Sequence, residues 1–128
     1  MKFLYGSVTA IVASAAMVCA AAPSTAQGQS AGAKTFVMCK GCHTIDKGGR
    51  NSIGPNLSGL FGRAAGSVAG YNYSAAMKKS GIRWDDKSLD EFLAAPTKKV
   101  PGTKMPISVA DPAKRAALIA YLKSATAN

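Results

Sequence analysis

The sequence predicts a small all-α domain, in which a few short helices are joined by long loops. Apolar residues recur at helical spacing in the second half of the chain, most clearly after Asp111. The stretch from Gly48 to Gly70 is rich in glycine, a composition that favours loops. Aromatic residues make up only 7% of the 128 residues, so the side chains alone form a modest core. A bound cofactor or metal is therefore expected to complete that core.

Residues 1–26 are predicted to be a secretory signal peptide that precedes the folded domain. Lys2 supplies a positive charge, Phe3 to Ala22 is almost wholly apolar, and Ser24-Thr25-Ala26 places small residues where a signal peptidase reads. We therefore expect cleavage after Ala26 and a mature domain over residues 27–128. The alternative is an uncleaved membrane anchor, because an apolar run of about 20 residues can span a bilayer. The Ala-rich, weakly hydrophobic composition and the polar residues that follow argue against it.

The composition limits the classes of function that the chain can have. With 48% hydrophobic and 17% charged residues the chain is too apolar to be disordered, and its length predicts one domain. The net charge is +10, and it becomes +9 when Lys2 leaves with the signal peptide. Nucleic acid is a common partner of basic chains, but export and the absence of a recognition motif argue against it here.

Four helices are expected in the mature domain. The first runs from about Ser30 to Lys40, and a short one covers about Ser74–Ser80. A third begins near Asp85, where the apolar residues Leu89, Phe92 and Leu93 follow helical spacing. The last is the clearest, because Asp111 suits the N-cap and Pro112 the first helical position. Its apolar stripe consists of Leu118, Ile119, Tyr121 and Leu122.

Residues 39–43 read Cys-Lys-Gly-Cys-His and carry the strongest chemical signal in the sequence. In this pattern two thiols add to the vinyl groups of haem, and the histidine is the proximal iron ligand. We therefore expect Cys39 and Cys42 to attach one haem covalently and His43, the only histidine, to bind its iron. A thioredoxin-like redox pair would need a preceding strand, whereas Ala33–Met38 enters the motif like a helix. A zinc site would lack ligands, because the mature chain has no other cysteine or histidine.

The sixth position of the iron requires a second ligand or stays open. Methionine is the natural candidate, and a His/Met pair is typical of electron-transfer haem proteins. Met105 lies in the segment from Val100 to Pro106, where prolines and a glycine favour a stiff loop that presents one side chain. Met38 adjoins Cys39 and is not expected to reach across the haem. Met77 lies in a short helical stretch, where a packing role is the simpler interpretation.

The order and spacing of several motifs resemble those of class I cytochrome c, in the branch of mitochondrial cytochrome c and bacterial cytochrome c2. The similar region extends from Gly32 to Thr126. The motifs are Cys39–His43, Gly54-Pro-Asn-Leu57, Gly59-Leu-Phe-Gly-Arg63, Gly81-Ile-Arg-Trp84 and Pro101-Gly-Thr-Lys-Met105. The resemblance implies the class I cytochrome c fold, with loops around one haem and the last helix packed on the first through Phe36. With a signal peptide in front, it implies a periplasmic protein.

The resemblance also implies roles for side chains around the haem. The carbonyl of Pro55 is expected to accept a hydrogen bond from His43 and so to set the tautomer of the imidazole. The positions of Arg63, Tyr73 and Trp84 face the haem propionates in the family, because a buried carboxylate must be paired or hydrogen-bonded.

Two positions depart from the family pattern, and a third follows it. Phe92 stands where the family usually has a tyrosine whose hydroxyl approaches the axial sulfur, and Met77 stands where it often has asparagine. Both changes are apolar, so we expect less internal water beside Met105 and a methionine ligand that is harder to displace at high pH. Thr103, within the matching methionine loop, is expected to bind the haem as well.

Lysines recur where the exposed haem edge is expected, at Lys40, Lys47, Lys98, Lys99 and Lys104. Clustered lysines indicate a docking face for acidic redox proteins, since complementary charge accelerates association. The expected partners are a cytochrome bc1-type donor and an oxidase or reductase acceptor, which a monomeric carrier would meet at the surface of membrane complexes.

The sequence therefore predicts a soluble, periplasmic one-electron carrier that is not an enzyme. One alternative is a haem-peroxidase-like enzyme with a vacated sixth position, although the sequence has no distal histidine to support acid–base chemistry. Another is a haem-free thiol oxidoreductase, which would use the cysteine pair alone.

Overall fold

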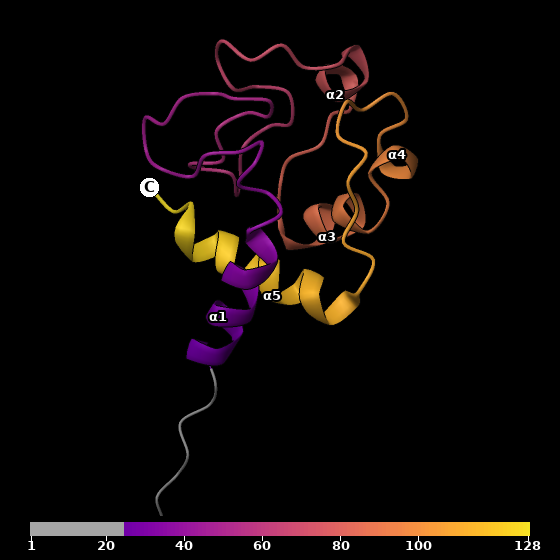
Figure 1. The fold of residues 1–128 in the computed structure, drawn as a ribbon. Helices are drawn as coiled ribbons and strands as arrows, with labels where there is room; N and C mark the ends of the chain where they lie inside the picture. The colour runs from indigo at the N-terminus through magenta and orange to yellow at the C-terminus, as the bar shows by residue number, and fades with distance from the viewer. Residues whose placement is uncertain (1–24) are drawn as a thin grey trace, which may run out of the picture.

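The structure is a computed structural model that describes residues 25–128 (Figure 1). The predicted signal peptide lies outside these residues except for its last two. Five helices are present in the described part: α1 (Thr25–Phe36), α2 (Ala75–Lys79), α3 (Asp86–Ala94), α4 (Pro96–Lys99) and α5 (Pro112–Ala125). Residues 25–128 contain no strand beyond an isolated bridge between Ala64 and Arg83. The predicted all-α class is confirmed. No helix within this range is long and apolar enough to cross a bilayer.

The first helix differs from the prediction at both ends. It begins at Thr25 rather than near Ser30, and it ends at Phe36 rather than at Lys40. After Phe36 the backbone tightens, because the amides of Val37 and Met38 bond to carbonyls three residues back. The haem motif therefore follows the helix as a series of turns.

The short helix α4 was not predicted. Pro96 occupies its first turn, and the amide of Val100 closes it on the Pro96 carbonyl at 2.9 Å. Four residues are too few for an apolar periodicity, so the sequence carries no signal for it beyond the proline.

Helices α1 and α5 pack against each other, as the resemblance implies (Figure 1). The side chains of Phe36 and Leu118 are almost wholly buried between them, and the rings of Phe36 and Tyr121 lie 5.5 Å apart. Gly32 permits the close approach, because a Cβ there would overlap the Ala117 carbonyl oxygen and the Tyr121 Cβ.

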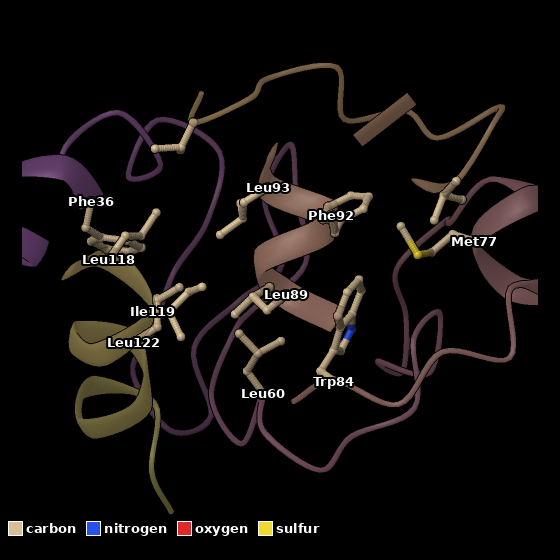
Figure 2. Packing of buried hydrophobic residues seen from close by; sticks show 12 residues of the cluster. Phe36, Leu60, Met77, Trp84, Leu89, Phe92, Leu93, Leu118, Ile119 and Leu122 are labelled. Carbon is tan, nitrogen blue, oxygen red and sulfur yellow. The ribbon is translucent and has the colours of Figure 1, made fainter. Parts of the chain in front are cut away.

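Helix α3 forms the centre of the core and begins with a reciprocal cap. The Asp85 carboxylate accepts from the Ser88 amide at 2.7 Å, and the Ser88 hydroxyl accepts from the Asp85 amide at 2.9 Å. Figure 2 shows the buried side chains of α3, which are Leu89, Phe92 and Leu93, between those of α5 on one side and those of Trp84 and Met77 on the other.

The first turn of α5 also has the predicted cap. Asp111 accepts from the amides of Ala113 and Lys114 at 2.8 and 3.1 Å. Arg115 then ties this helix to α3 through Asp90 and to the preceding loop through the Val109 carbonyl. Helices α1, α3, α4 and α5 are thus connected by mutual contacts, and the loops of residues 37–74 extend from them (Figure 1).

Candidate haem-binding site

A cavity of about 350 Å³ lies between α3, α5 and the long loops. This volume falls in the usual range of small-molecule sites, about 300–1,000 Å³. Much of its wall is apolar, and no acidic side chain of the described residues contributes to it. All nine predicted site residues line it: Cys39, Cys42, His43, Pro55, Arg63, Tyr73, Trp84, Thr103 and Met105.

The two cysteines lie on one turn of the chain and have free thiols. The amides of Cys42 and His43 both bond to the Cys39 carbonyl, at 3.0 and 2.9 Å, which folds the motif toward the cavity. Burial raises the pKa of the Cys39 thiol, and the nearby Cys42 raises it further. Both thiols are therefore placed on the cavity wall, where the vinyl groups of a haem would meet them.

The imidazole of His43 is oriented by the backbone. Its Nδ1 lies 2.8 Å from the Pro55 carbonyl oxygen, as the resemblance implies. Because a carbonyl only accepts, Nδ1 carries the proton and the Nε2 lone pair is free for a metal. Burial lowers the pKa of His43, although the Pro55 hydrogen bond opposes this, and nearby Arg63 lowers it too. Gly54 leaves room for the ring, because a Cβ there would overlap the imidazole carbon Cε1.

Arg63 presents an unpaired donor inside the protein. Its terminal nitrogens donate to the carbonyls of Ser58 and Asn56 at 2.8 and 3.2 Å. Its Nε is buried with no hydrogen-bond partner among the described residues. A buried orphan donor on a cavity wall fits an anionic group that completes it. Burial lowers the pKa of Arg63 and raises that of the neighbouring Tyr73.

Met105 reaches the cavity from an irregular loop, as predicted. Its amide bonds to the Thr103 hydroxyl at 3.2 Å, and the Thr103 amide bonds to the Val100 carbonyl at 3.0 Å. Lys104 ties the loop across the cavity rim by donating to the Asn72 carbonyl at 2.8 Å. Met38 and Met77 also line the cavity, the first largely exposed and the second buried in α2. Three thioethers therefore share this site.

One polar residue behind the site, Asn56, was not predicted from the sequence. Asn56 is buried, and its side chain bonds to three partners in the surrounding loops. The signal that could have identified it is its position in the sequence, because Asn56 is a polar residue between Pro55 and Leu57 in a short loop motif.

The zinc alternative requires a cluster of metal-binding side chains. Residues 25–128 hold no group of three His, Cys, Asp or Glu side chains that could bind a metal ion together.

The residues present fit a haem. Two thiols, one oriented imidazole, a thioether and an unpaired arginine donor share one largely apolar cavity. A helical fold with this site defines a c-type haem protein of class I.

Comparison with known proteins identifies the family. The sequence profile of cytochrome c matches residues 29–126, and the chain belongs to the cytochrome c family. It is 50% identical over 103 residues to cytochrome c of Nigella damascena, covering 78% of this chain and 93% of that protein. It is 44% identical over 108 residues to cytochrome c2 of Blastochloris viridis, covering 84% and 85%. The structure of cytochrome cH from Methylobacterium extorquens superimposes with a TM-score of 0.69 at 48% identity, covering 75% of this chain and 97% of that one.

Membership of the family establishes the cofactor and the general activity. The chain carries covalent haem c through Cys39 and Cys42, and it is an electron carrier rather than an enzyme.

Proposed function

We propose that this protein is a periplasmic one-electron carrier whose haem iron is bound by His43 and Met105. Residues 1–26 form its cleaved signal peptide, and residues 27–128 form the cytochrome c domain. One observation carries the ligation: the backbone-oriented imidazole and the Met105 loop line the same cavity as the two cysteines. The signal-like leader, together with the similarity to cytochrome c2 and cytochrome cH, supports export.

When bound, the haem supplies reversible one-electron exchange between ferrous and ferric iron. Cys39 and Cys42 keep it attached, so that it stays with the protein through many cycles. Pro55 holds the His43 proton on Nδ1 and so keeps Nε2 available to the iron. Met105 provides a soft thioether, which favours the ferrous state and raises the reduction potential. The residues that would hold the polar edge of the haem are Arg63, Tyr73, Trp84 and Thr103, which all line the cavity. The unpaired Nε of Arg63 would donate to a propionate.

The surface around the cavity mouth supports docking of redox partners. Met38, Ile53 and Ile107 are exposed by 49%, 74% and 45%, and all three line the cavity. Lys104 is exposed and also lines the cavity, and Lys40, Lys47 and Lys98 are exposed near the cysteine motif and the methionine loop in the sequence. A small apolar centre with a charged surround suits weak, short-lived complexes with acidic partners, such as a cytochrome bc1-type donor and an oxidase or reductase.

Lys99 differs from the expectation for this face. Its ammonium group forms an ion pair with Glu91 of α3, so its charge is largely compensated within the molecule. The sequence did not indicate this partner, because Glu91 and Lys99 lie on different helices.

A visible spectrum of the haem-loaded protein tests the ligation. We expect low-spin haem with the weak methionine–iron charge-transfer band. Met105→Ala should abolish that band and lower the potential, whereas Met77→Leu, a change within the same cavity, should retain the band. A high-spin ferric spectrum of the unmodified protein would contradict the proposal and favour the haem-peroxidase-like alternative. For that alternative the described cavity wall offers no second histidine, and its arginine, Arg63, is held by backbone carbonyls.

A further inference from the structure

Two polar residues are buried in the described core, and each forms hydrogen bonds with the backbone of one loop. Asn56 is 8% exposed and Thr126 is 1% exposed. Buried polar groups are costly unless they are hydrogen-bonded, so their partners indicate what they hold in place. Asn56 lies within residues 55–59, which we call the carbonyl loop, and the backbone carbonyl of Thr126 accepts from the Gly59 amide of the same loop.

Asn56 uses its whole amide group to anchor the carbonyl loop. Its Nδ2 donates to the Thr44 hydroxyl at 2.8 Å and to the Asp46 carbonyl at 3.0 Å. Its Oδ1 accepts from the Ser58 backbone amide at 2.9 Å. The backbone amide of Asn56 donates to Asn51 Oδ1 at 2.9 Å. The backbone on both sides of Asn56 is therefore held.

The carbonyls of this loop point to two functional side chains. The Pro55 carbonyl accepts from His43 Nδ1 at 2.8 Å. The carbonyls of Asn56 and Ser58 accept from the two terminal nitrogens of Arg63. Neighbouring residues of one loop thus orient both the axial imidazole and the arginine of the polar wall.

Residues 126–128 secure the far end of the loop. The Gly59 amide donates to the Thr126 carbonyl at 2.6 Å, and the Ser58 hydroxyl donates to Asn128 Oδ1 at 2.8 Å. The C-terminal end of the chain accordingly lies beside these loops in Figure 1. The loop is held by Asn56 on one side and by the end of α5 on the other.

We propose that Asn56 is a positioning residue that couples the orientation of His43 to that of Arg63. The three carbonyls move with one loop, so loss of the Asn56 anchor loosens both side chains together. This inference deepens the proposed function, because it depends on His43 as the iron ligand.

The test uses Asn56→Ala in the haem-loaded protein, with Asn72→Ala, an exposed asparagine, as the matched control. NMR follows the exchange with solvent of the His43 Nδ1 proton and of the Arg63 Nε proton. We expect both to exchange roughly tenfold faster in Asn56→Ala, the equivalent of about one hydrogen bond, and neither to change in Asn72→Ala. The backbone amide of Leu118 should exchange at its original rate, which separates the effect from general loosening.

A double-mutant cycle tests the coupling itself. The changes in reduction potential caused by Asn56→Ala and by Arg63→Gln should be non-additive. The reason is that Asn56→Ala displaces the Arg63 guanidinium, which Arg63→Gln removes altogether. Thr44→Val removes a single Asn56 partner and should produce the same two exchange changes at smaller size, even if Asn56→Ala folds poorly. Faster exchange at only one of the two side chains, or additive potentials, would overturn the proposal. Failure of the His43 ligation would appear separately, as a high-spin spectrum of the unmodified protein.

Discussion

The protein environment of His43 by itself favours the neutral imidazole with its proton on Nδ1. Burial lowers the pKa of the imidazole, and the Pro55 carbonyl holds its single proton on Nδ1. Burial favours the neutral imidazole, and within that neutral form the Pro55 carbonyl selects the tautomer with Nε2 unprotonated, which is the form that a metal requires. The opposing effect of the Pro55 hydrogen bond on the pKa is smaller than that of burial.

The apolar residues Met77 and Phe92 are predicted to protect the methionine ligand at high pH. Both line the cavity and are 8% and 4% exposed. Restoring polar groups with Met77→Asn and Phe92→Tyr should lower the midpoint for loss of the methionine–iron band by about one pH unit, or ~1.4 kcal/mol. An alkaline titration of that band measures it, with Phe61→Tyr, outside the cavity lining, as control. Equal midpoints in the unmodified and doubly substituted proteins would contradict this view.

Arg63 is predicted to raise the reduction potential. Its half-buried positive charge on the cavity wall disfavours the oxidised haem, which carries one more positive charge than the reduced form. Arg63→Gln should therefore lower the potential by roughly 60 mV, equivalent to about 1.4 kcal/mol for one electron. Redox titration measures the shift. Arg83→Gln, an exposed arginine that does not line the cavity, is the control, and equal shifts in the two variants would exclude a specific role for Arg63.

At the scale of elements, the α1–α5 contact depends on the absence of a side chain at Gly32. Alanine is intrinsically better than glycine in a helix by about 1 kcal/mol, so propensity alone predicts that Gly32→Ala stabilises the protein. The overlap with Ala117 and Tyr121 outweighs this gain. We expect a net loss of about 1–3 kcal/mol in the free energy of unfolding, measured with guanidinium chloride. Gly41→Ala, whose Cβ would meet no atom within 4 Å, should have little effect.

The cap of α5 is predicted to make stability depend on pH in acid. The hydrogen bond from the Lys114 amide, with smaller help from Ala113, lowers the pKa of Asp111 below its ordinary value of 3.8. A lowered pKa in the folded state means that this stabilisation is present above pH 3.8 and is lost as the pH falls through the lower value. Asp111→Asn keeps a capping side chain that does not titrate. Its melting temperature should fall less between pH 5 and pH 2 than that of the unmodified protein.

Asp46→Asn is the control for the cap, because Asp46 is exposed and caps no helix of the described residues. The same acid dependence in Asp111→Asn and in the unmodified protein would remove Asp111 as its source.

At the scale of the whole molecule, charge is unevenly distributed along the chain. Five of the six carboxylates lie between Asp85 and Asp111, where they cap helices or pair with basic side chains. Among residues 25–128, no ion pair involves Lys40, Lys47, Lys98 or Lys104, whereas Lys99 pairs with Glu91. Lys104 lines the cavity, so it places positive charge that no ion pair neutralises at the cavity wall, where it is available for association.

This distribution predicts that reaction with an acidic partner depends on salt. Lys40→Gln, between the two cysteines, should slow the second-order reaction with a candidate oxidase several-fold at low ionic strength. The difference should disappear near 1 M salt, where the Debye length is about 3 Å. Stopped-flow kinetics measures the rates, with Lys114→Gln on α5 as control. Equal slowing by both substitutions would indicate a general charge effect without a localised docking face.

The sequence by itself determined the haem attachment and the all-α class. The cysteines and His43 lie within five consecutive residues, so their spacing indicates haem attachment without reference to any distant segment. The cap at Asp111 is likewise visible in the sequence, because it involves only neighbouring residues. The ends of α1, the four-residue α4 and the Lys99–Glu91 pair were not predictable in this way, because they depend on turns and contacts that leave no periodic pattern. Met105 and Arg63 were expected at the site from the sequence, and the tertiary structure places both on the wall that holds His43. Only the tertiary structure identified Asn56 as an anchor. The role of Asn56 depends on tertiary packing, because the hydrogen bonds of a buried side chain are made with segments that are distant in the sequence and that only the fold brings next to it.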